Sequence, residues 1–134
     1  MSNAVAVPST DVTETPGFRL RIAGTTRAGP PRDWIEALDG FTRRNAGRRV
    51  TLETDACGPG RRVIGRGYRL TGVTYDPYDR RVGVMLAGEG GARVHLMHAV
   101  PRVESIAMAA DERGNELLEL QHGGNATLLW VQPG

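Results

Sequence analysis

The residues from 48 to 131 repeat one pattern, in which a short segment of alternating apolar and polar residues is followed by a turn of Gly, Asn, Asp or Pro. Alternation with a period of two puts apolar side chains on one face of a β-strand, and such turns connect consecutive strands. The pattern therefore predicts a series of antiparallel strands. The last two, residues 117–121 and 126–131, are predicted to form a C-terminal hairpin.

A single amphipathic helix is predicted before these strands, over residues 33–47. Asp33 and Glu36 have the spacing of a capping box at its start, and Gly47 is suited to end it in the left-handed conformation. One helix followed by a train of strands predicts an α+β fold, in which the strands form a strongly bent antiparallel small β-barrel. Three apolar residues share one face of the predicted helix: Trp34, Leu38 and Phe41.

The longest predicted strand, residues 62–75, contains the expected bend. Tyr68 and Leu70 share one face before Gly72, whereas Val73 and Tyr75 share one face after it, so the buried face changes at that glycine. Such a change indicates a β-bulge, which bends the strand and lets a short sheet curl.

We expect two regions: an extended N-terminal arm over residues 1–31, and a domain of helix and barrel over residues 32–134. Within the arm, one segment alternates apolar and cationic residues, as a half-buried strand does. It is expected either to dock on the edge of its own barrel or to add as a strand to a partner protein. The candidate partner-binding residues are Phe18, Arg19, Leu20, Arg21 and Ile22.

The charges of the chain are segregated. Residues 43–102 carry 12 arginines and 5 acids, whereas residues 103–134 carry 1 arginine and 5 acids. A basic middle and an acidic end indicate either an anionic partner or neighbouring strands that offset each other's charge. Four arginines in a glycine-rich stretch are the candidate contacts to an anion or a nucleic acid: Arg61, Arg62, Arg66 and Arg69.

No constellation of catalytic residues is evident, so we predict neither a catalytic site nor an enzyme. The chain has no lysine, which excludes a Gly-Lys phosphate loop and Schiff-base chemistry. His95 and His98 are three apart in a predicted strand and therefore point to opposite faces, which argues against a shared metal ion. His122 is expected to be a solvated turn residue. No metal and no cofactor are predicted.

The lone cysteine, Cys57, excludes an internal disulfide, so a reducing cytoplasm fits best. Its neighbours Arg61 and Arg62 favour the thiolate, but no histidine lies nearby in sequence to act as a base, and an incidental loop thiol is the expected reading. No stretch approaches the roughly 20 apolar residues that a membrane-spanning helix needs. We therefore expect no transmembrane segment.

Four short motifs carry a resemblance to a known family: Phe41-Thr42-Arg43-Arg44-Asn45, Leu70-Thr71-Gly72-Val73-Thr74-Tyr75-Asp76, His95-Leu96-Met97-His98 and Thr127-Leu128-Leu129-Trp130. They resemble an uncharacterised bacterial family that is catalogued only as a domain of unknown function. The resemblance covers residues 33–131, carries no activity or catalytic residue with it, and leaves the arm outside. The architecture is also similar to the small Sm-like and SH3-like barrels.

The leading hypothesis for function is a non-enzymatic protein-interaction module, such as an accessory or stabilising subunit of a larger complex, including one associated with a membrane. The alternative is a small barrel that binds RNA or DNA through its arginine-rich face, with tyrosines as stacking surfaces. A net charge of +2 is low for a dedicated nucleic-acid binder.

Overall fold

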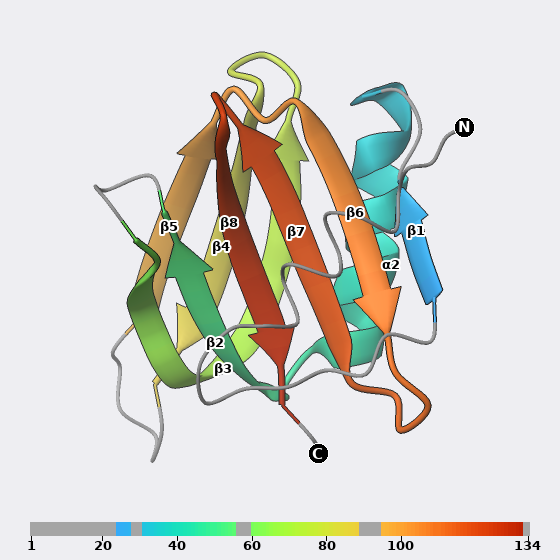
Figure 1. The fold of residues 1–134 in the computed structure, drawn as a ribbon, viewed down its shortest axis with the longest axis vertical. Helices are drawn as coiled ribbons and strands as arrows, with labels where there is room; N and C mark the ends of the chain where they lie inside the picture. The colour runs from blue at the N-terminus through green and yellow to red at the C-terminus, as the bar shows by residue number, and fades with distance from the viewer. Residues whose placement is uncertain (1–23, 28–30, 56–59, 89–94, 133–134) are drawn as a thin grey trace.

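The computed structural model describes residues 24–27, 31–55, 60–88 and 95–132, and its fold is shown in Figure 1. These residues form one α-helix, α2 (Trp34–Asn45), which follows a short 3-10 turn, η1 (Pro31–Asp33). All the strands belong to one antiparallel sheet, so the predicted α+β fold is confirmed. The strands are β1 (Gly24–Arg27), β2 (Arg49–Thr54), β3 (Arg62–Asp76), β4 (Arg81–Ala87), β5 (His95–Pro101), β6 (Ser105–Ala110), β7 (Glu116–His122) and β8 (Asn125–Val131).

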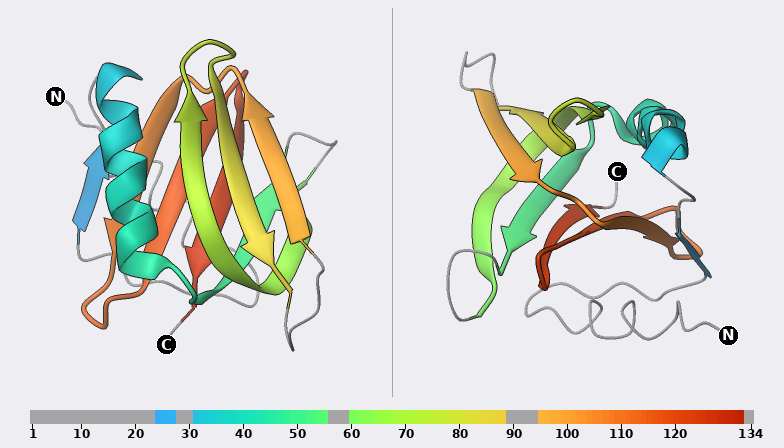
Figure 2. Two further views of the ribbon diagram at one scale, coloured as in Figure 1. Left: turned by 180° about the vertical axis from the view of Figure 1, so that it is seen from behind. Right: turned by 90° about the horizontal axis from the view of Figure 1, so that it is seen from above.

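The order of the strands in the sheet is β1-β6-β7-β8-β2-β3-β4-β5. The sheet curls strongly, as the view from above shows (Figure 2), but β1 and β5 do not pair with each other. The predicted bend is therefore present, whereas the described strands form an open sheet rather than a closed barrel. Helix α2 lies across the inner face of the curl and buries its apolar side chains there, so the core is covered without closure.

The curl has a local cause in β3. Its pairing with β4 shifts register between Leu70 and Gly72, which confirms the predicted bulge, and its pairing with β2 shifts twice more. Extra residues on one strand of a pair bend that strand and increase its twist. As a result Gly65 lies so close to Leu96 of β5 that a Cβ atom at residue 65 would be 3.0 Å from the Leu96 Cδ2 atom.

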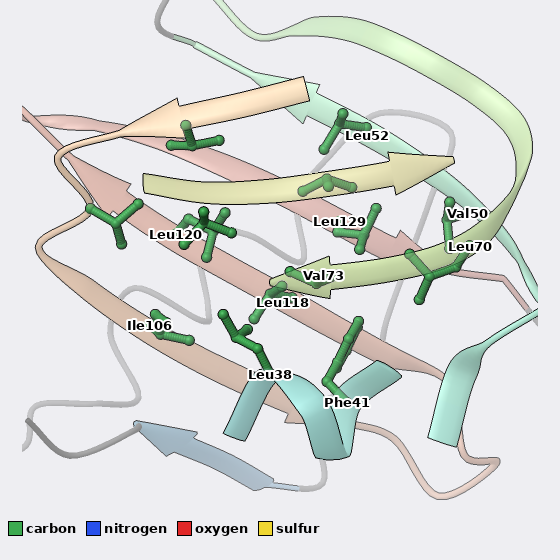
Figure 3. Close-up of a cluster of buried hydrophobic side chains, with 14 of the residues drawn as sticks. Leu38, Phe41, Val50, Leu52, Leu70, Val73, Ile106, Leu118, Leu120 and Leu129 are labelled. Atoms are coloured by element: carbon green, nitrogen blue, oxygen red, sulfur yellow. The ribbon is translucent and has the colours of Figure 1, made fainter. Parts of the chain in front are cut away.

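The hydrophobic core lies between α2 and the inner face of the sheet (Figure 3). Trp34 also makes an edge-to-face contact with Tyr75, with ring centroids 5.0 Å apart. The Thr42 hydroxyl accepts a hydrogen bond of 3.0 Å from the Val73 amide, which fixes the helix against β3. The core includes Leu38, Phe41, Val50, Leu52, Leu70, Val73, Ile106, Leu118, Leu120 and Leu129, each at most 2% exposed.

The predicted cap is absent at the start of α2, whereas the predicted glycine conformation is present after its end. Asp33 precedes the helix, but its side chain makes no capping hydrogen bond, so that part of the expected capping box is wrong. The turn η1 occupies residues 31–33 instead, because proline at residue 31 favours a tight helical turn. At the other end Gly47 has φ +84°, as expected, and its amide donates to the Leu70 carbonyl at 2.8 Å.

Part of the predicted arm belongs to the sheet. Residues 24–27 form β1, which pairs antiparallel with β6, so this portion docks on the edge of its own chain. The segment Phe18–Ile22 lies outside the described residues. None of the helices in the described part of the chain combines the length and the apolar character that crossing a membrane requires.

Candidate interaction surface

Strand β5 is one end of the sheet and pairs only with β4 among the described strands. Its seven residues contain no Asp, Glu, Lys or Arg. Edge strands in natural sheets are normally short, charged, bulged or covered, because their unpaired N–H and C=O groups can pair with another chain. The pairing of β5 with β4 is regular over its whole length, so β5 is a long, uncharged and unbulged edge. The opposite edge, β1, has only four residues.

The side chains of β5 alternate in exposure, as they do in a half-buried strand. We call the face of the sheet toward α2 the inner face and the other the outer face. Val100 is buried on the inner face, and Leu96 and His98 are half-buried there. On the outer face His95, Met97, Ala99 and Pro101 are exposed, and Met97 has 62% of its surface exposed.

Met97 packs over a glycine of the neighbouring strand. Its Cε atom lies 3.1 Å from where a Cβ atom would stand on Gly83 of β4. Met85 lies over Gly72 of β3 in the same way, at 3.2 Å. Methionine is polarisable and has three rotatable bonds, so it adapts to partners of different shape. Met97 and Met85 therefore provide apolar and adaptable contacts on the outer face next to the β5 edge.

The four arginines predicted to contact an anion are all exposed, with Arg61 just before β3 and the other three within it. Arg66 and Arg69 share the outer face with the residues of β2 opposite them, Thr51 and Arg49. Arg69 donates a hydrogen bond of 2.9 Å to the Gly47 carbonyl. Arg69 therefore also supports the turn that follows α2.

Arg61 and Arg66 act on a carboxylate of their own chain, Glu53 of β2. Burial raises the pKa of the Glu53 carboxyl, and a hydrogen bond from Trp130 and the charges of Arg61 and Arg66 lower it in part. Glu53 is only 4% exposed, so these two cations offset the cost of a buried charge. The structure thus gives three of the four arginines a role within the chain.

His122 is not the solvated residue that its place before two glycines predicts. Only 8% of its surface is exposed, and its Nε2 atom lies 2.8 Å from the Thr127 hydroxyl. The turn itself is confined to Gly123 and Gly124, so residue 122 is still in β7 and its side chain faces inward. Alternation along β7 with Leu118 and Leu120 is the signal that would have placed it there.

Two histidines from distant strands come together at the inner face. Burial lowers the pKa of His98 below its usual value of 6.5, and the nearby charge of His122 lowers it further. Burial also lowers the pKa of His122, against the opposing charges of Asp55 and Glu104. Both imidazoles therefore favour the neutral form when the protein is folded.

Acidification is expected to destabilise the protein through these two residues. The unfolded chain takes up protons near pH 6.5 while the folded chain resists them, so stability is present above that pH and is lost as the pH falls toward the folded-state pKa values. Each histidine changes the free energy of unfolding by at most about 1.4 kcal/mol per pH unit. Solvent screening makes the contribution of half-buried His98 smaller. Urea unfolding at pH 7.5, 6.5 and 5.5 measures how steeply the free energy of unfolding falls with pH.

The matched variant is His98→Gln with His122→Gln, because glutamine preserves a polar nitrogen near Thr127 but does not titrate. Its unfolding free energy should vary less than that of the wild type between pH 7.5 and 5.5. An equal slope in the two proteins would show that other groups cause the acid sensitivity.

The described residues hold no group of three or more His, Cys, Asp and Glu side chains arranged to bind a metal ion. Cys57 lies outside them. A groove of about 430 Å³ lies between α2 and β6 and is lined in part by the Arg44–Glu116 ion pair, with a nitrogen–oxygen distance of 3.0 Å. The side-chain hydrogen bond to Glu116 raises the pKa of Arg44, so this pair stays charged and holds the helix to the sheet. The groove therefore has a structural role.

No family model, curated protein or solved structure matches this chain. The resemblance to the uncharacterised bacterial family stays a prediction.

Proposed function

We propose that this protein is a non-enzymatic interaction module that binds an extended segment of a partner protein along β5. The observation that carries the proposal is the seven-residue edge strand without a charged side chain, next to a methionine that is 62% exposed. Main-chain hydrogen bonds from such an edge provide affinity for an added strand, and the side chains beside it provide specificity.

The geometry indicates the chemistry of the partner segment. A strand added to β5 continues the alternation of the sheet, so every second side chain falls on the outer face beside Met97 and Ala99. The intervening side chains fall on the inner face beside Leu96 and His98, which are half-buried. Neither row of β5 carries a charge, so a partner strand with small or apolar residues suits both faces.

A role as accessory subunit in a reducing cytoplasm belongs to the same proposal and is supported by the lone cysteine. Binding of RNA or DNA remains the alternative. It is less well supported, because Arg61 and Arg66 offset the buried charge of Glu53 and Arg69 donates to the Gly47 carbonyl.

The proposal is tested by Met97→Glu in the full chain, with Ile35→Glu as the matched control. Ile35 lies on α2 and is 53% exposed, so both substitutions add one negative charge at a similarly exposed apolar residue. A charge in the middle of an edge strand opposes the addition of another strand. We expect at least one protein that co-purifies with the wild type and with Ile35→Glu to be reduced more than tenfold with Met97→Glu, measured by quantitative mass spectrometry.

Equal recovery of every co-purifying protein with the two variants would overturn the proposal. Sedimentation equilibrium identifies a different occupant. If the wild type dimerises and Met97→Glu does not, β5 pairs with a second copy of the chain rather than with another protein.

A further inference from the structure

Two methionines and a histidine lie together on the outer face of β4 and β5. Met85 of β4 is paired in register with Met97 of β5, and the next outer residue toward the start of β5 is His95. His95 and Met97 are exposed, and Met85 is half-buried. Val84 and Leu86, on either side of Met85, face the core, so the three side chains project from the same side of the sheet.

The register sets the distances between these side chains. Residues directly opposite each other in antiparallel strands, as Met85 and Met97 are, have Cβ atoms about 4.5–5.5 Å apart. Residues two apart along one strand, as His95 and Met97 are, are separated by roughly 7 Å. Methionine and histidine side chains are long enough for two sulfur atoms and one nitrogen atom to meet at a point between the three residues.

Two glycines leave the space that this convergence needs. The Met97 Cε and Sδ atoms lie 3.1 Å and 3.8 Å from where a Cβ atom would stand on Gly83, and the Met85 Cε atom lies 3.2 Å from the same position on Gly72. Because glycine has no side chain, nothing at residues 72 and 83 prevents the thioethers from turning toward His95. Methionine has three rotatable bonds with which to do so.

The donor atoms of this cluster suit a soft metal ion. Thioether sulfur selects Cu(I), and imidazole nitrogen is also a copper ligand. Neither β4 nor β5 contains an Asp or a Glu, so these strands supply none of the carboxylates that Mg²⁺ and Ca²⁺ prefer. We propose that Met85, Met97 and His95 bind one Cu(I) ion on the outer face of β4 and β5.

Competition for Cu(I) in the full chain tests the site. The background is Cys57→Ser, because a thiolate is itself a metal ligand. The protein is titrated without oxygen into the coloured complex of Cu(I) with bathocuproine disulfonate. We expect one Cu(I) per chain, bound at least tenfold less tightly after Met85→Leu, Met97→Leu or His95→Gln. Leucine keeps the apolar shape that packs over glycine, and Met108→Leu on β6 is the matched control, which should bind as the background does.

Absence of Cu(I) binding by the Cys57→Ser protein would overturn the proposal. So would binding by any of the three site variants that is as tight as binding by Met108→Leu. The purified chain is used without a partner, and Met97→Leu leaves β5 uncharged. The result is therefore independent of the proposed addition of a partner strand.

Nuclear magnetic resonance locates the ion without a further substitution. The probe is Ag(I), a soft ion of the same charge as Cu(I), added to the Cys57→Ser protein with carbon-13 in its methionine methyl groups. The chain has 4 methionines, so each signal can be assigned. One equivalent of Ag(I) should shift the methyl signals of Met85 and Met97 and leave that of Met108 in place. Unchanged signals of Met85 and Met97 would overturn the proposal, and so would an equal shift of Met108.

Discussion

Replacement of Phe41 by alanine is expected to lower the free energy of unfolding by about 3–5 kcal/mol. Phe41 is 0% exposed and lies in the middle of the contact between α2 and the sheet (Figure 3). Alanine removes the ring and leaves a cavity that the surrounding strands fill only in part. Because the sheet is open, the helix is what covers the inner core, and loosening it exposes that core to water.

The control for this prediction is Ile35→Ala, on the same helix but with 53% of the side chain exposed. We expect it to change the unfolding free energy by about 0.5 kcal/mol. Urea midpoints and slopes, followed by circular dichroism, compare the two variants with the wild type. A small effect of Phe41→Ala, similar to that of Ile35→Ala, would mean that the helix is not essential to the core.

Local patterns in the sequence predict the elements of this fold well, because their physical causes are local. The spacing of apolar residues defines α2 to within three residues, and the change of phase at Gly72 marks the bulge in β3. The order of the strands is different, because it depends on pairing between distant segments. Nothing in the sequence of β2 shows that it lies between β8 and β3, or that β5 ends the sheet.

The candidate surface on β5 could not be predicted from the sequence either, because it depends on the order of the strands. The absence of charge in β5 becomes informative only once the strand is known to be an edge, since a strand in the middle of a sheet can also lack charged residues. A second buried cluster, on the outer face of β6, β7 and β8, consists of Ala109, Leu117, Ala126, Leu128 and Trp130. One signal for it was present in the sequence, however. Residues 128–131 are apolar without alternation, which is typical of a strand buried on both faces. Leu129 faces the inner core and Leu128 the outer cluster, as that run implies.

The second large effect is expected at Arg48, where Arg48→Ala should destabilise the protein by about 3 kcal/mol. The half-buried guanidinium joins three segments that are distant in sequence. Its Nη1 atom donates to the Asn45 side-chain oxygen and to the Gly114 carbonyl, both at 3.1 Å, and its Nη2 atom donates to the Gln132 carbonyl at 3.0 Å. Hydrogen bonds from a charged donor contribute about 1.5–3 kcal/mol each when they cannot be replaced.

The loss should be large because water cannot fully replace these bonds. Asn45 is 0% exposed and also donates from its Nδ2 atom to the Phe41 carbonyl, so the alanine variant leaves a buried acceptor without its donor. Arg43→Ala is the matched control, since Arg43 is exposed on the helix that precedes Arg48 and forms an ion pair with Asp39 one turn away. Such an exposed pair contributes about 0.5 kcal/mol or less. If thermal unfolding shows equal losses for the two variants, the bonds of Arg48 contribute no more than a surface ion pair, and the end of α2 must be held by the Gly47–Leu70 backbone bond instead.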